Sequence, residues 1–246
     1  MLGRWKKNTG TCFYRSDDLI KVMDRSGISK ALVFGSHAKF SQIEDGNSKL
    51  TKDIGGCERL LPCAVALPHH TKEFMDPVSF TGYLKSNDIR AVRIFPEFHG
   101  VSLYTWLWQD LFSRLETARI PVFIDLSLGH WSQEVDWGKI HDLCVSFPKL
   151  PFVMVRMGVK TDRYIYPLFG KFENLHIETS YYLVNNGIEN MVRNFGAGRL
   201  LFGTGMPVYK PEPPMKTLEF ADITDEDKRM IAGENLMKLL KGAYPE

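Results

Sequence analysis

Arg199-Leu200-Leu201-Phe202-Gly203-Thr204-Gly205-Met206-Pro207 is the stretch of sequence that decides the fold. Its first four residues form a short, mainly apolar run after a Gly-Ala-Gly turn, which is typical of a buried parallel strand. Residues 203–207 then end that run abruptly, since they contain two glycines and a proline. The stretch therefore predicts a buried strand that opens into a tight loop.

A helix is predicted after this loop. Thr224 is placed to cap its amino terminus, with Asp227 three residues later as a variant of the capping box. The helix ends in the pattern Gly233-x-Asn235-x-x-x-Leu239-Leu240, shortly before a further glycine. Between the strand and this helix, residues 211–214 read Pro-Glu-Pro-Pro and predict a stiff loop.

Earlier in the chain, short apolar runs alternate with amphipathic stretches. This alternation predicts right-handed strand–helix–strand units and a parallel sheet. The seven predicted strands are residues 30–34, 60–66, 89–95, 121–125, 152–156, 175–178 and 199–202. Between them, Tyr104, Trp106, Trp108 and Phe112 recur at helical spacing and are expected to pack against the sheet.

The pattern Phe202-Gly203-Thr204-x-x-Pro207, followed by the capped helix, resembles the carboxyl terminus of the amidohydrolase-related family of TIM-barrel hydrolases and decarboxylases. The resemblance implies an α/β fold, a TIM (β/α)8-type barrel. In that family the pattern is Phe-Gly-Ser/Thr-Asp-x-Pro, and its aspartate is a metal ligand and proton shuttle. This chain has Gly205 at that position, which can do neither.

A closed barrel of this type needs eight strands. In the family, the first strand carries a His-x-His metal pair immediately before a Leu-Gly step, and this chain starts with Met1-Leu2-Gly3. The resemblance therefore implies that the first strand is largely missing from the chain, through a truncated or misassigned start; the other reading is a sheet open on one side. A flank left bare in this way predicts a homodimer or poor solubility.

The resemblance places two further metal-binding histidines at positions that here hold Asp125 and Arg156. A guanidinium is always charged and would repel a divalent cation. We therefore expect no metal at this site and no cofactor, although the family would use a divalent metal such as zinc.

Asp125, Arg156 and Glu178 all fall at the carboxyl ends of predicted strands, where barrel enzymes assemble their sites. One interpretation is a salt-bridge network that fills the space of a lost metal. The other is a site in which Arg156 binds a substrate carboxylate or phosphate while Asp125 or Glu178 acts as the catalytic base. The two interpretations are compatible.

Histidines also follow predicted strands. Glu97 and His99 lie in a Pro-x-x-His-Gly loop and are candidates for an acid/base pair, the alternative being a loop histidine that bonds the backbone. His69 and His70 follow another strand, and adjacent side chains point in different directions, so at most one of them, His69 in our hypothesis, would contact the substrate.

Length and composition limit the number of domains, the kinds of partner and the cellular location that we expect. The 246 residues contain no linker, which favours a single domain over residues 1–246. With 31 basic and 29 acidic residues, a net charge of +2 and no basic stripe, a nucleic-acid partner is not expected. No apolar run approaches the roughly 20 residues that span a bilayer, so no membrane partner is expected. The four cysteines form no CxxC pair, which favours reduced thiols and a cytoplasmic location.

The sequence thus predicts a hydrolase or decarboxylase that acts on a small carboxylated or cyclic substrate without the usual metal centre. The alternative is a catalytically inactive barrel that serves as a ligand-binding or scaffold protein.

Overall fold

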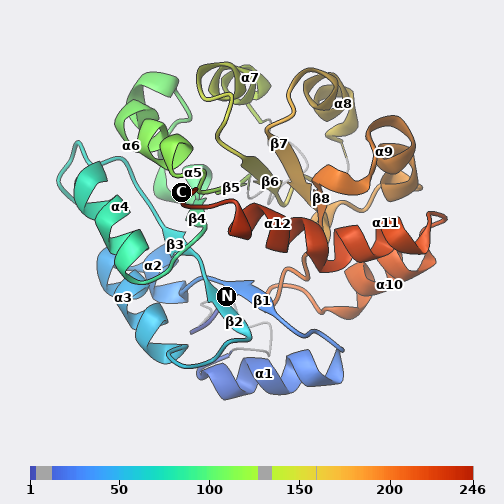
Figure 1. Ribbon diagram of the computed structural model, residues 1–246, viewed down its shortest axis with the longest axis horizontal. Helices are drawn as coiled ribbons and strands as arrows, with labels where there is room; N and C mark the ends of the chain where they lie inside the picture. The colour runs from blue at the N-terminus through green and yellow to red at the C-terminus, as the bar shows by residue number, and fades with distance from the viewer. Residues whose placement is uncertain (4–12, 127–134, 159, 246) are drawn as a thin grey trace. The chain divides into compact units, whose positions relative to one another are not determined.

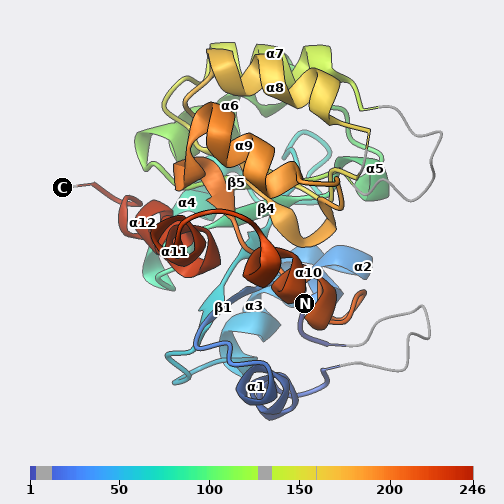
Figure 2. The same cartoon turned by 90° about the vertical axis from the view of Figure 1, so that its right-hand side faces the viewer.

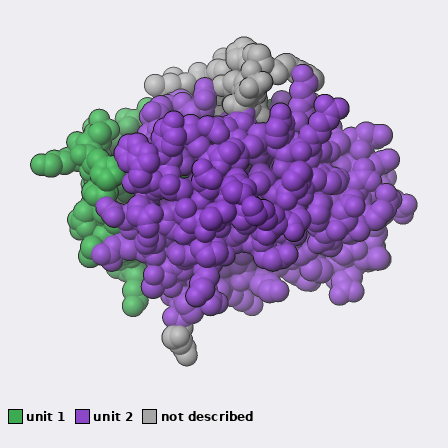
Figure 3. All heavy atoms as spheres, turned by 90° about the horizontal axis from the view of Figure 1, so that it is seen from above, with its two compact units in different colours: residues 1–94, 205–211 green, residues 95–204, 212–246 purple. Residues whose placement is uncertain are grey.

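A computed structural model describes residues 1–3, 13–126, 135–158 and 160–245. The chain divides into two compact units, coloured separately in Figure 3. Unit 1 contains residues 1–94 and 205–211, and unit 2 contains residues 95–204 and 212–246. Each unit is described by itself below, and a single domain over residues 1–246 stays a prediction.

The strands of unit 1 are parallel pairs. β1 (Ala31–Val33) pairs with β2 (Leu60–Pro62), and β3 (Ala64–Val65) pairs with β4 (Val92–Ile94). The prediction of one strand over residues 60–66 was wrong in that the run is divided at Cys63. Pro62 has no N–H with which to continue a ladder. The backbone N–H of Cys63 donates to Val33, whereas that of Ala64 donates to Ala91, so the run pairs first with β1 and then with β4. The seven predicted runs thus become eight strands, β1 to β8, in the part of the chain that the structure describes.

The core of unit 1 lies where α1 (Ser16–Arg25) and α3 (Ile43–Asp53) cover β1 and β2. It is built from the buried side chains of Leu2, Phe13, Leu19, Met23, Val33, Leu50, Ile54 and Leu60. Leu2 forms a parallel bridge with Gly35, just beyond the end of β1. The buried Asn47 side chain bonds both the N–H and the C=O of Val65, at 2.8 Å each, and so fixes α3 against β3.

Unit 2 contains four parallel strands in chain order: β5 (Val122–Asp125), β6 (Phe152–Val155), β7 (Leu175–Glu178) and β8 (Leu200–Leu201). Every residue of β5 and β6 is buried, as expected for parallel strands covered on both faces. Helices lie outside these strands, and α7 and α8 run side by side in Figures 1 and 2. These helices are α6 (Thr105–Thr117), α7 (Trp137–Ser146), α8 (Asp162–Lys171) and α9 (Gly187–Phe195).

The other helices are shorter or lie nearer the chain ends. They are α2 (Ser36–Phe40), α4 (Pro77–Ser86), α5 (Pro96–His99), α10 (Glu212–Phe220), α11 (Asp225–Arg229) and α12 (Asn235–Lys241). The predicted loop at residues 211–214 was wrong from Glu212 onward, because Pro213 and Pro214 lie in the first turn of α10, where a missing N–H costs nothing. Within the described ranges, no helix combines the length and apolar character that crossing a bilayer requires.

The aromatic stripe of α6 is only half buried. Trp108 and Phe112 are buried and stack with ring centroids 5.0 Å apart. In contrast, Tyr104 and Trp106 remain 48% and 68% exposed, so the prediction that they pack against the sheet was wrong. These two lie at the start of α6 and stack on each other, and Lys139 lies 4.2 Å from the Tyr104 ring centroid.

The carboxyl-terminal helix is held against β8 by the segment Gly233-x-Asn235 of the sequence pattern. Thr224 caps α11 by accepting the N–H of Asp227, as predicted. A π-helical turn (Met230–Glu234) then separates α11 from α12. Such a turn frees carbonyl groups from the helix ladder, and the Ile231 carbonyl accepts the N–H of Phe202. The buried Asn235 amide donates to the carbonyls of Ala197 and Leu200 at 2.8 and 2.9 Å, so it ties the helix to both the start of β8 and the turn before it.

Asn235→Ala is expected to lower the free energy of unfolding by about 2–4 kcal/mol, since it leaves two buried carbonyls without a donor. Urea unfolding monitored by circular dichroism measures this loss. The control is Asn194→Ala, which removes an exposed hydrogen bond from the Asn194 side-chain amide to the carbonyl of Asn190. It should lower the free energy of unfolding by less than about 1 kcal/mol. Equal losses in the two variants would contradict the role assigned to Asn235.

A buried histidine lies in β7. His176 is 9% exposed, and its Nδ1 has no hydrogen-bond partner among the described residues. Burial, with a smaller contribution from the nearby Arg199 charge, lowers the pKa of His176 to about 4. The imidazole is therefore neutral in the folded protein over the whole physiological range.

This pKa predicts a loss of stability in mild acid. Because the folded-state pKa lies below the ordinary value of 6.5, the unfolded chain binds a proton that the native protein does not, and stability falls as the pH drops from 6.5 to about 4. The loss should reach about 3 kcal/mol relative to His176→Gln. Urea unfolding at a series of pH values measures it. His141→Gln, which changes an exposed histidine, should keep the wild-type slope, and an unchanged slope in His176→Gln would refute the assignment.

Candidate functional site

Two oppositely charged side chains lie at neighbouring strand ends of unit 2. Asp125 is the last residue of β5 and is 1% exposed. Arg156 directly follows β6, and its side chain is 18% exposed. The register pairs Asp125 with Val155, so Arg156 stands one residue beyond the strand pairing. Its Nη1 lies 3.9 Å from Oδ1 of Asp125, a separation that marks a loose ion pair rather than a short hydrogen bond.

Arg156 has an unusual backbone. Its φ of 61° lies in the left-handed region, which is rare for a residue with a long side chain. Conformations of this kind cost about 1–3 kcal/mol and occur most often at functional sites. In addition, the Nε of Arg156 is buried and makes no hydrogen bond to any described residue. The guanidinium therefore retains a buried donor that an anionic ligand can use.

Glu178 is held in place by its own turn. It ends β7, and its carboxylate accepts the N–H of Ser180 at 3.1 Å and the Ser180 hydroxyl at 2.7 Å, which caps the short helix η1 (Thr179–Tyr181). The same carboxylate fills the space beside Gly203, so a Cβ there would collide with it. Glycine is thus needed at position 203 because Glu178 occupies the position of a side chain.

His99 and Glu97 lie together in α5, which packs against β5. The His99 ring contacts Phe95 and Phe98 edge to face, with centroids 5.7 and 5.5 Å apart. The predicted loop is therefore one turn of helix, ended by Gly100 in the left-handed conformation. The structure fixes the His99 ring between two aromatic rings and places Glu97 in the same turn.

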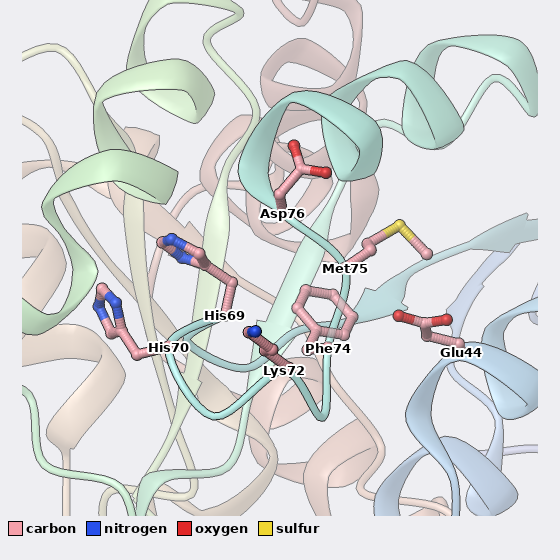
Figure 4. Close-up of a pocket in the computed structure, with 7 residues that line it drawn as sticks. All are labelled: Glu44, His69, His70, Lys72, Phe74, Met75 and Asp76. Atoms are coloured by element: carbon pink, nitrogen blue, oxygen red, sulfur yellow. The ribbon is translucent and has the colours of Figure 1, made fainter.

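His69 lies in unit 1, at an open pocket of about 580 Å³. The pocket is formed by the segment that follows β3, together with one side chain from α3 (Figure 4). His69 and His70 both border it, and the expectation that at most one of them contacts the substrate stays a prediction. The full lining is Glu44, His69, His70, Lys72, Phe74, Met75 and Asp76.

The divalent metal implied by the sequence resemblance can be tested against these side chains. Among the residues that the structure describes, no group of three His, Cys, Asp or Glu side chains is placed to hold a metal ion. Asp125 faces the guanidinium of Arg156 in place of an imidazole, and Gly205 supplies no ligand atom. The residues at these strand ends therefore do not fit the family's metal centre.

Sequence reasoning missed several contributors to these sites. Ser180 had a usable signal, because a serine two residues after an acidic residue is a common capping arrangement. The close contact between Gly203 and Glu178 had no such signal, since it depends on how β7 and β8 pack in the folded chain. The pocket side chains Lys72 and Phe74 follow His69 closely in the sequence but carried no motif.

Solved structures of known proteins share this fold. A TIM-barrel protein from Bordetella bronchiseptica, itself uncharacterized, matches with a TM-score of 0.74 and 17% identity over 92% of this chain and 83% of that chain. 2,6-Dihydroxybenzoate decarboxylase from Rhizobium matches with a TM-score of 0.75 and 15% identity over 97% and 92%. Dihydroxybenzoic acid decarboxylase from Polaromonas, with bound manganese and the inhibitor 2-nitroresorcinol, matches with a TM-score of 0.69 and 15% identity over 94% and 87%.

These likenesses confirm the predicted fold class, an α/β TIM-barrel type. No curated protein sequence matches the chain at a significant level. The family model described as Amidohydrolase matches residues 83–242, which is more than half of the chain. The segment includes the Phe202-Gly203-Thr204 pattern and the capped helix that first carried the resemblance. By this match, the chain belongs to the amidohydrolase family.

Proposed function

We propose that the protein is a hydrolase or decarboxylase of small carboxylated substrates, with aromatic acids as the first class to test, and that it works without a metal centre. The observation that carries the proposal is the buried Asp125 beside the left-handed Arg156 at adjacent strand ends. Strand ends of this kind are where barrel enzymes place their catalytic groups.

Arg156 is the proposed anchor for the substrate. A guanidinium offers several N–H donors in a fixed plane and suits a carboxylate better than any other side chain. The buried Nε of Arg156 supports this role, because a desolvated donor without a partner gains most from an anionic acceptor. A substrate carboxylate would then compete with Asp125, whose distance of 3.9 Å already leaves the pair loose.

Asp125 is the proposed proton carrier. In hydrolysis, it would take a proton from water while the water oxygen bonds to the substrate carbon, and would pass that proton to the leaving group. In decarboxylation, the bond between the ring carbon and the carboxylate carbon breaks, CO2 leaves, and protonated Asp125 delivers its proton to the ring carbon. Water then returns a proton to Asp125, and the hydroxide left behind combines with the released CO2 as bicarbonate.

The other candidate residues have supporting roles in this proposal. Both Glu178 oxygens are engaged by Ser180, which favours Asp125 over Glu178 for proton transfer. Glu178 would shape the site beside Gly203 and remains the alternative base. His99 and Glu97 would form the wall of the site next to β5.

The choice of aromatic acids rests on the structural neighbours. Two of them are decarboxylases of dihydroxybenzoic acids. At 15% identity these neighbours support the substrate class only as a starting point for assays.

The rival function is that of a ligand-binding or scaffold protein without catalysis. It is favoured by the fact that both acids already have partners within the protein: Asp125 forms an ion pair with Arg156, and Glu178 accepts hydrogen bonds from Ser180. A site of this kind can hold a ligand or simply stabilise the barrel.

Asp125→Asn is expected to lower the rate of CO2 release from 2,6-dihydroxybenzoate by about 100-fold or more, because it removes the proton carrier. Arg156→Gln should instead raise KM about tenfold or more by removing the anchor. Asp88→Asn, which breaks an exposed ion pair with Arg90, is the matched control and should keep wild-type kinetics. If the wild type acts on none of a panel of carboxylated aromatic acids and their esters, the binding or scaffold function is favoured.

We further expect activity to survive removal of metal. Dialysis against EDTA should leave kcat/KM unchanged, because no step depends on a bound cation. Elemental analysis of the same sample should find no stoichiometric zinc, manganese or iron. Loss of activity on dialysis, restored by adding one of these metals back, would show that the proposal of a metal-free site is wrong.

A further inference from the structure

The pocket of unit 1 has two chemically different halves. One half is a turn that follows β3 and carries His69, His70 and Lys72. The other half is apolar and is formed by Phe74 and Met75. Figure 4 shows these side chains in succession along one segment, with Glu44 reaching in from α3 at the apolar end. The volume of the pocket, about 580 Å³, is in the range of pockets that bind small molecules.

The first half gathers groups that can carry positive charge. The N–H of Lys72 donates to the carbonyl of His69 at 3.0 Å and closes the turn, with Lys72 in the left-handed region at a φ of 63°. The rings of His69 and His70 lie 4.4 Å apart, centroid to centroid. An ammonium group and two imidazoles within four residues offer N–H donors and therefore suit an anion better than a cation.

The apolar half is held in place from behind. Phe74 is 4% exposed and contacts Phe80 of α4 edge to face, with centroids 4.8 Å apart. Met75 lies beside it and has a side chain that adapts to different shapes. This half therefore offers a fixed floor and an adjustable wall to a flat apolar group.

The two carboxylates of the pocket, those of Asp76 and Glu44, differ in whether they can bind a ligand. Asp76 caps α4 and accepts the N–H groups of Val78 and Ser79 and the Ser79 hydroxyl, and these bonds lower the pKa of Asp76. Its carboxylate is thus committed to the helix. Glu44, in the first turn of α3, lies across the apolar half from the histidines (Figure 4). It would repel an anion at its own end and accept a hydrogen bond from a hydroxyl group there.

We infer that this pocket binds an aromatic hydroxy acid, with the carboxylate at His69, His70 and Lys72, the ring on Phe74 and Met75, and the hydroxyl group directed to Glu44. On the proposed function this ligand is the carboxylated substrate or a close relative of it. The binding itself does not depend on that function.

The test is isothermal titration of the purified protein with 4-hydroxybenzoate, and with benzoate as the analogue that lacks the hydroxyl group. Lys72→Met and the double variant His69→Gln/His70→Gln should each weaken the binding of both compounds about tenfold or more, since each removes charge-assisted hydrogen bonds. Glu44→Gln should weaken only the binding of 4-hydroxybenzoate. Lys49→Met, which removes an exposed lysine of α3 paired with Asp53, is the charge-matched control and should bind both compounds as the wild type does.

Three results would overturn the inference. The first is a wild-type Kd weaker than about 10 mM for 4-hydroxybenzoate. The second is binding that the pocket variants leave unchanged. The third is an equal loss in the Lys49 control. Titration of Arg156→Gln separates the inference from the proposed function: if it alone loses binding, the pocket assignment is wrong and the Arg156 anchor stands. If the pocket variants lose binding while the wild type catalyses nothing, the pocket stands and the catalytic proposal falls.

Discussion

Parallel pairing of β5 to β8 in one fixed register is the constraint on which the candidate site depends. Parallel strands end at the same edge of a sheet, so whatever follows each strand meets its neighbours there. The pairing of Asp125 with Val155 brings Arg156 next to Asp125, and the pairing of Glu178 with Leu201 brings Gly203 under the Glu178 carboxylate. A shift of one residue in either ladder would turn these side chains to the opposite face.

The fold was largely predictable from the sequence, for a physical reason. Strands buried on both faces are continuous apolar runs, and a run such as residues 152–155 leaves little ambiguity when amphipathic stretches flank it. Proline was the source of two errors. Pro62 divides an apolar run that looks continuous, and the prolines after residue 212 begin a helix although they suggested a loop. In both cases the effect of the missing N–H depends on the hydrogen-bond partners that the folded backbone offers at that position, and the sequence does not show these partners.

The site was predictable only in part. Which residues stand at strand ends follows from the pattern, and the placement of Asp125, Arg156 and Glu178 was predicted in this way, whereas their roles stay a prediction. What each side chain does there does not follow from it. The left-handed backbone of Arg156 and the contact between Glu178 and Gly203 arise from packing between strands. The exposed aromatics Tyr104 and Trp106 illustrate the same limit, because helical spacing shows that residues share a face but not where that face ends.

A guanidinium in place of a metal changes which reactions the site suits. A divalent metal both holds an anion and lowers the pKa of bound water, which supplies hydroxide for hydrolysis. Arg156 can hold an anion but cannot bind a water molecule as a metal does, so Asp125 alone would have to activate water. Decarboxylation needs no hydroxide: it requires a held carboxylate and one delivered proton. The pair formed by Arg156 and Asp125 provides both groups, and for this reason we place decarboxylation ahead of hydrolysis among the reactions to test first.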